Sequence, residues 1–162
     1  MTRKRKKRMS SEDQFMNQHF EELQHKYTAE GKEVTRDYSP HSEGKISDRI
    51  SFLIQPVLEK EGSDKSDFAK TVIGFACTAW NASLLKITER QKTIDDLLNT
   101  LTPIANDPKG KILIHALIDD FVARKLKHFP NDRRYITGYK AAVINDRLQI
   151  SVASVDLEDQ QT

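Results

Sequence analysis

The chain has 162 residues, of which 37% are hydrophobic and 31% are charged, so it is long enough for one modest core. Its single cysteine, Cys77, excludes an intramolecular disulfide and fits a reducing compartment. The basic start is followed by polar residues, and no apolar run reaches the roughly 18 residues that a membrane helix needs. These features exclude a secreted or membrane-spanning protein, so we expect a cytoplasmic protein without membrane contact.

Positive charge is concentrated at the N-terminus. The net charge is +2, but the six basic residues before Met9 leave 20 basic against 24 acidic residues in the rest of the chain. A flexible cationic segment binds polyanions by releasing counterions, and without an aromatic side chain it offers no base stacking. We expect residues 1–10 to form a disordered tail that either contacts nucleic acid without sequence preference or is only solvated. The cationic residues are Arg3, Lys4, Arg5, Lys6, Lys7 and Arg8.

An amphipathic segment follows the tail. Phe15, His19, Leu23 and Tyr27 recur at helical spacing, which predicts a helix at about 12–28 capped by Ser11 or Asp13. The next residues mix glycine, proline and serine with charges, so residues 11–44 are predicted to be a helical arm and a polar linker. The apolar face of the arm must dock on the body, on a second copy or on another protein.

Residues 45–157 are predicted to form one globular domain. Its helical stripes predict helices at about 46–61, 64–85, 88–102 and 108–128, and the second is central because it is apolar on nearly all sides. Pro56 predicts a kink or a break in the first helix. Thr88 with Gln91 predicts a capping box, and Asp107 before Pro108 predicts another helix start.

Strand-forming residues replace the helical pattern after Pro130. They predict strands at about 134–144 and 147–156, joined at Asn145-Asp146, a pair that tolerates the positive φ of a tight hairpin turn. Two strands alone are marginal in water, so the hairpin must lie on the helices or pair with another chain. The predicted fold is α+β and predominantly helical, a bundle of three to four helices with a C-terminal two-stranded antiparallel hairpin. Residues 158–162 are expected to fray.

Two groups of residues are candidates for a site. Four cations at the junction between the last helix and the first strand are spaced for a phosphate-sized anion patch, or they only compensate a helix dipole. These are Lys125, Lys127, Arg133 and Arg134. His115 and Asp119 share a helix face, and Asp95 and Asp120 supply further carboxylates, but no paired ligand motif completes a metal site. Glycine-rich phosphate loops are absent, so we expect neither a metal nor a cofactor.

The sequence therefore favours a non-catalytic intracellular binding or adaptor protein. It would make protein–protein contacts, or a homodimer, through the N-terminal arm or the hairpin edge, and would contact polyanions through the tail. The alternative is a metal-dependent, hydrolase-like enzyme whose site is assembled from dispersed acids and His115. Cys77 is flanked by apolar residues, so we expect a buried inert thiol rather than a nucleophile.

Overall fold

The computed structural model describes residues 9–31, 44–61, 66–101 and 106–157. Residues 1–8 of the predicted basic tail, most of the linker and the C-terminal residues 158–162 lie outside these ranges. The fold is α+β and predominantly helical with a C-terminal antiparallel hairpin, which confirms the predicted class. No helix in these ranges has the length and apolar character needed to cross a membrane. The elements in chain order are α1 (Ser11–Thr28), α2 (Ile46–Glu61), α3 (Ser66–Ser83), α4 (Ile87–Thr100), α6 (Pro108–His128), β1 (Arg134–Ile144) and β2 (Arg147–Asp156).

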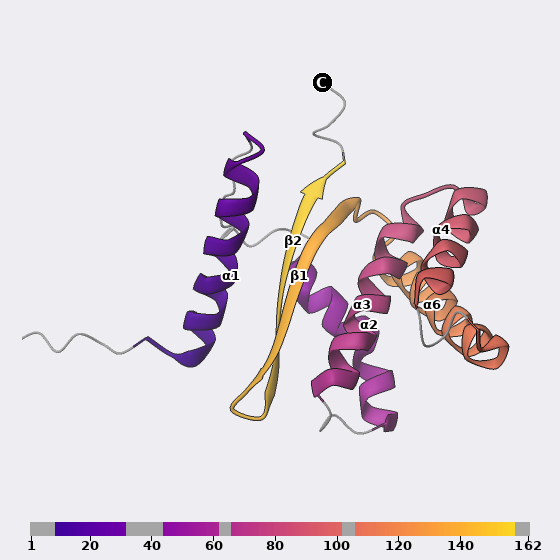
Figure 1. The fold of residues 1–162 in the computed structure, drawn as a ribbon, viewed down its shortest axis with the longest axis horizontal. Coiled ribbons are helices and arrows are strands. Elements are labelled where there is room, and N and C mark those ends of the chain that lie inside the picture. The colour runs from indigo at the N-terminus through magenta and orange to yellow at the C-terminus, as the bar shows by residue number, and fades with distance from the viewer. Residues whose placement is uncertain (1–8, 32–43, 62–65, 102–105, 158–162) are drawn as a thin grey trace, which may run out of the picture.

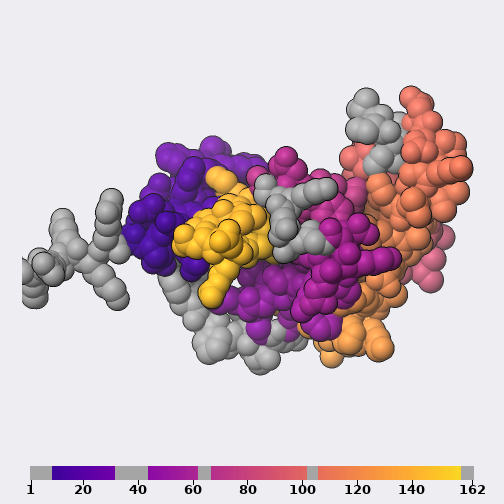
Figure 2. All heavy atoms as spheres, turned by 90° about the horizontal axis from the view of Figure 1, so that it is seen from below, coloured from indigo at the N-terminus to yellow at the C-terminus, as the bar shows by residue number. Residues whose placement is uncertain are grey.

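The elements are arranged in layers (Figure 1). The hairpin lies between α1 on one face and α2 and α3 on the other, and α4 and α6 pack beyond α3. Figure 2 shows the same order from below, with the hairpin in yellow between α1 in indigo and α3 in magenta. The helical bundle therefore supplies the surface that a two-stranded sheet needs, and α1 covers its other face.

Helix α3 is the centre of the core, as its nearly continuous apolar sequence predicted. Ile73, Ala76 and Trp80 are fully buried on it, and α2, α4, α6 and β1 all pack against it. The remaining core side chains come from these neighbours and include Ile50, Leu53, Ile54, Ile94, Leu98, Ile118, Phe121 and Ile136. Cys77 is also buried, and burial raises the pKa of its thiol to about 12, so it is the inert thiol expected.

The helix starts differ in part from the predicted caps. Ser10 caps α1, since its Oγ accepts a hydrogen bond from the Asp13 amide, so neither Ser11 nor Asp13 is the cap. The predicted capping box at Thr88 is wrong, because α4 already begins at Ile87. The cap at Asp107 is confirmed, with its carboxylate accepting from the Lys109 amide.

Pro56 does not break α2, which continues to Glu61. Proline has no amide hydrogen, so the carbonyl of Phe52, one turn earlier, loses its usual helical donor. Arg124 of α6 replaces that donor, with its Nη2 3.0 Å from the Phe52 carbonyl oxygen. Its guanidinium also lies over the Phe52 ring. A contact from a distant part of the sequence therefore satisfies the group that proline leaves unpaired.

The hairpin has the predicted tight turn, with φ of 51° at Asn145 and 59° at Asp146. Its pairing is regular from Ile144 opposite Arg147 until a bulge between Ile136 and Gly138. The extra residue lets Ile136 point toward the helices on the same face as Tyr139. Tyr139 lies over α3 at Gly74, where an added Cβ would be only 2.7 Å from the tyrosine Oη.

Helix α3 also binds the outer edge of β1. The Asn81 side chain donates to the Ile136 carbonyl and accepts from the Ile136 amide, both at 2.8 Å. Trp80 Nε1 donates to the Arg134 carbonyl at 2.7 Å. These three bonds satisfy backbone groups that point away from β2, so the start of β1 is fixed to the core and is closed as a sheet edge.

Replacing Asn81 with alanine tests this attachment. Asn81→Ala leaves the amide and carbonyl of buried Ile136 without partners, so we expect the free energy of unfolding to fall by about 2 kcal/mol. Urea denaturation followed by circular dichroism measures this loss. Asn99→Ala is the matched control, since exposed Asn99 accepts only from Lys111. Equal losses in the two variants would contradict the assignment.

Candidate functional site

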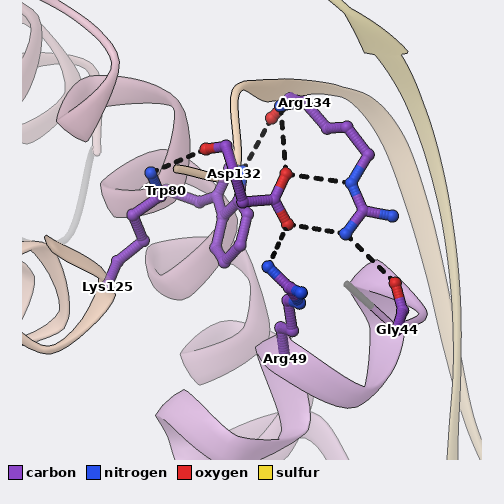
Figure 3. Close-up of polar contacts among 6 residues, drawn as sticks. All are labelled: Gly44, Arg49, Trp80, Lys125, Asp132 and Arg134. Atoms are coloured by element: carbon purple, nitrogen blue, oxygen red, sulfur yellow. Dashed lines mark hydrogen bonds and ion pairs between the residues drawn. The ribbon is translucent and has the colours of Figure 1, made fainter. Parts of the chain in front are cut away.

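The predicted cationic junction is organised around a carboxylate of the chain itself (Figure 3). Asp132 is 1% exposed, and its Oδ2 lies 2.6 Å from both Arg49 Nη1 of α2 and Arg134 Nη2 of β1. Arg134 Nε adds a bond of 2.9 Å to Oδ1. Lys125 of α6 donates to the Asp132 backbone carbonyl at 2.8 Å and lies over the Trp80 ring. Two helices and a strand therefore converge on one residue.

In this cluster, burial and the neighbouring charges have opposing effects on the pKa values of Asp132 and Lys125. Burial by itself would raise the pKa of Asp132, but hydrogen bonds from Arg134 and the charges of Arg134 and Arg49 hold that pKa below its usual value. Burial lowers the pKa of Lys125, against the pull of the Asp132 charge. The carboxylate is thus held ionised by the cations around it, an arrangement that is costly to break by removing the anion.

The four residues of the predicted anion patch do not form one open surface. Lys125 is 1% exposed, and Arg134 is engaged with Asp132, whereas Lys127 and Arg133 are exposed. Asp132 occupies the position at which an external anion would meet Lys125 and Arg134. Asp132 was not among the residues predicted for this site, because its partner Arg49 is distant in the sequence and no local pattern relates the two.

The residues of the alternative enzyme hypothesis lie apart from this cluster, and most of them line an open groove of about 620 Å³ between α4 and α6. His115 Nδ1 is 2.9 Å from Asp119 Oδ2, and His115 Nε2 is 3.7 Å from Asp95 Oδ1. Asp120 does not line the groove. Three of the four predicted side chains therefore come together, with Leu98, Asn99, Lys111, Ile112 and Ala116 as the other lining residues.

In this groove, the polar contacts are those of His115 with carboxylates, and the neighbouring surface is apolar. Both ring nitrogens of His115 already face carboxylates, and within the described ranges no three His, Cys, Asp or Glu side chains are placed to hold a metal ion. Ile112, which lines the groove, is 69% exposed, and Leu113, the next residue of α6, is 71% exposed. The arrangement is an i,i+4 His–Asp pair with a neighbouring carboxylate beside an apolar ridge.

Helix α1 rests on the outer face of the hairpin through a polar contact. His19 is buried, and its Nδ1 is 2.5 Å from Ser151 Oγ of β2. Beside it, Lys140 of β1 binds Glu22 at 2.7 Å. Burial lowers the pKa of His19, the Lys140 charge lowers it further, and Glu22 opposes the shift. A neutral histidine is therefore the form that fits the docked arm.

This contact predicts that acid weakens the docking of α1. Because docking lowers the pKa of His19, the undocked arm binds the proton more tightly, so docking is strongest above the ordinary value of 6.5 and weakens as the pH falls below it. Hydrogen exchange corrected for intrinsic rates should show less protection of α1 at about pH 5.5 than at about pH 7.5.

His19→Asn should abolish most of that pH dependence, because asparagine can still bond Ser151 but does not titrate. His25→Asn is the control on the same helix, since His25 is exposed and its replacement should leave the pH dependence of α1 protection unchanged. A pH dependence that survives His19→Asn unchanged would contradict the role of His19.

The outer edge of β2 differs from that of β1. Arg134 and Ile136 direct backbone groups toward α3, so their partners Asp156 and Ser154 direct theirs away from β1. The alternation of an antiparallel ladder extends this outward set to Val152, Ile150 and Leu148. Within the described ranges, no backbone hydrogen bond from another element reaches Leu148, Ile150, Val152 or Ser154.

The same edge lacks the side chains that usually protect an open strand. Proteins guard edges with charges, prolines, bulges or very short strands. Between Arg147 and Asp156, the eight residues Leu148–Val155 include no charge and no proline, and the bulge of the hairpin lies on β1. The edge of β2 is therefore a candidate interaction site. The sequence predicted contacts through a hairpin edge without saying which, and the structure favours that of β2.

Comparisons with known proteins place no constraint on this site: no family model, no curated protein and no solved structure matches the chain.

Proposed function

We propose that this protein is a non-catalytic intracellular binding protein that accepts an extended strand of a protein partner along the outer edge of β2. The observation that carries the proposal is the contrast between the two edges, since Trp80 and Asn81 bind that of β1 while the backbone of β2 is open in the described structure. Strand addition derives affinity from main-chain hydrogen bonds, so it needs such an edge and no catalytic group.

The faces of the hairpin support the same function. Helices α2 and α3 cover one face and α1 covers the other, so in the described part of the chain the strands lie between two layers and their edges are left for pairing. An added strand would enlarge a two-stranded sheet, which is marginal by itself, toward the size that most sheets have. Binding would thereby stabilise the element that contains the site.

A proline on the open edge tests the proposal. Ser154→Pro removes an outward amide hydrogen and leaves the bonds between β1 and β2, so the fold should persist while partner binding weakens about tenfold or more. Ser154→Ala is the matched control, because it keeps the amide. Affinity capture from the native host, followed by quantitative binding of the captured protein, compares the three forms. Equal binding by both variants and the wild type would contradict strand addition.

We also propose that the basic tail contacts a polyanion. Its six cations are separate from a mildly acidic remainder, so the tail is the part of the sequence with the clearest electrostatic preference for phosphate. The composition supports binding without sequence preference, because no aromatic side chain interleaves the charges.

Deleting residues 1–8 should abolish this contact. The full chain should bind single-stranded RNA of arbitrary sequence with an affinity that falls steeply with salt, and the shortened chain should bind at least about tenfold more weakly at low salt. Fluorescence anisotropy at several salt concentrations measures both. Unchanged RNA affinity after deletion would contradict the assignment, and a chain with Lys127 and Arg133 replaced by glutamine is the control for cations elsewhere.

A further inference from the structure

We infer that the strand accepted by β2 is β2 of a second copy, so that two hairpins form one four-stranded antiparallel sheet around a twofold axis at Ser151. This inference rests on the proposed function and specifies its partner. Three features support it: the register that the open groups allow, the composition of the strand and the position of α1.

The outward backbone groups and the charges at the strand ends together favour one register. The outward set is Leu148, Ile150, Val152 and Ser154, with charged Asp156 at the end of the strand, and the midpoint of the four uncharged residues is Ser151. Antiparallel pairing about a twofold axis normal to the sheet sets residues of the same face opposite each other. An axis through Ser151 pairs Leu148 with Ser154 and Ile150 with Val152 of the second copy and leaves the charge of Asp156 outside the pairing. An axis through Val152 would set Asp156 opposite Leu148, a charge opposite an apolar side chain. The pairing would add about eight main-chain hydrogen bonds.

The composition of β2 suits pairing with itself. A strand that meets its own copy near its centre sets any central charge close to the same charge, which is unfavourable. Leu148–Val155 has no charge, so no such conflict arises. On the face toward the helices, Ile150 would contact Val152 of the second copy, and both already pack against the core.

The place of α1 also fits a second copy. Helix α1 contacts both β1 and β2, so it lies over the middle of its hairpin. In a continuous sheet with strands about 4.8 Å apart, the centres of two adjacent hairpins are two spacings, or about 10 Å, from each other. Packed helices are about 8–10 Å apart, so the two α1 helices would meet across the axis without a gap or a clash.

The register makes a charge test possible. It sets exposed Arg147 opposite Val155 of the second copy, and Val155 is 37% exposed in the single chain. Val155→Lys would introduce a like-charge pair at both ends of the interface, whereas Val155→Glu would introduce an opposite-charge pair. The two variants change the same side chain in opposite senses, so a general loss of fold would not mimic the expected pattern.

Sedimentation equilibrium of the full chain over a wide concentration range measures the dimer dissociation constant. We expect a dimer whose dissociation constant rises about tenfold in Val155→Lys and does not rise in Val155→Glu. The double variant Arg147→Glu with Val155→Lys should recover the wild-type value, because it restores opposite charges. Circular dichroism of each variant confirms that the fold is kept.

Two results would overturn the inference. One is a wild-type chain that stays monomeric at the highest concentration reached, and the other is a dimer whose dissociation constant responds equally to lysine and glutamate at position 155. The proposed function fails separately. A monomer that captures another protein through the edge, with binding weakened by Ser154→Pro, would refute self-pairing and leave strand addition standing.

Discussion

The buried carboxylate of Asp132 is the interaction on which the arrangement of this protein depends. It is bound by Arg49 of α2 and Arg134 of β1, and its backbone carbonyl is bound by Lys125 of α6. These contacts fix the point at which the chain leaves the helical bundle and enters the hairpin (Figure 3). A buried ion cluster of this kind adds little net stability compared with an apolar core, but removing one of its partners is strongly destabilising. Its main effect is therefore to fix the geometry of the elements that it joins.

The position of the hairpin decides which of its edges is open. Once Arg134 is fixed by Asp132, its carbonyl meets Trp80, and Ile136 meets Asn81 two residues later. The start of β1 is thereby closed by α3, and the outward groups of β2 are directed away from β1. The proposed binding edge is thus a consequence of where the cluster anchors the first strand. Helix α1 then covers the remaining face through His19 and Ser151, a contact that we expect to weaken in acid because burial lowers the pKa of His19.

Local sequence patterns predicted the elements but not the contacts between them. The stripe of Ile46, Ile50, Leu53 and Ile54 and the turn at Asn145-Asp146 carry short-range signals, and the structure has a helix and a hairpin there. Of the kink or break predicted at Pro56, the break is wrong, since α2 continues to Glu61, and a distant arginine, Arg124, binds the carbonyl that proline leaves free. Lys125 and Arg134 were interpreted as a patch for an external anion, since the carboxylate that binds them is recognisable only in three dimensions. Likewise, the sequence predicted that an edge of the hairpin pairs with another chain. Assigning that role to β2 required the structure, in which Trp80 and Asn81 bind the edge of β1.

The most direct test of the claim that Asp132 organises the fold is the free energy of unfolding of Asp132→Asn relative to the wild type. Urea denaturation followed by circular dichroism measures it. The substitution keeps the shape of the side chain and removes the buried negative charge that Arg49 and Arg134 bind beside buried Lys125, so the account predicts a loss of about 3–5 kcal/mol. Asp120→Asn, an exposed carboxylate on α6, should change it by less than about 0.5 kcal/mol. A loss at Asp132 no larger than that at Asp120 would contradict the claim that this carboxylate organises the fold.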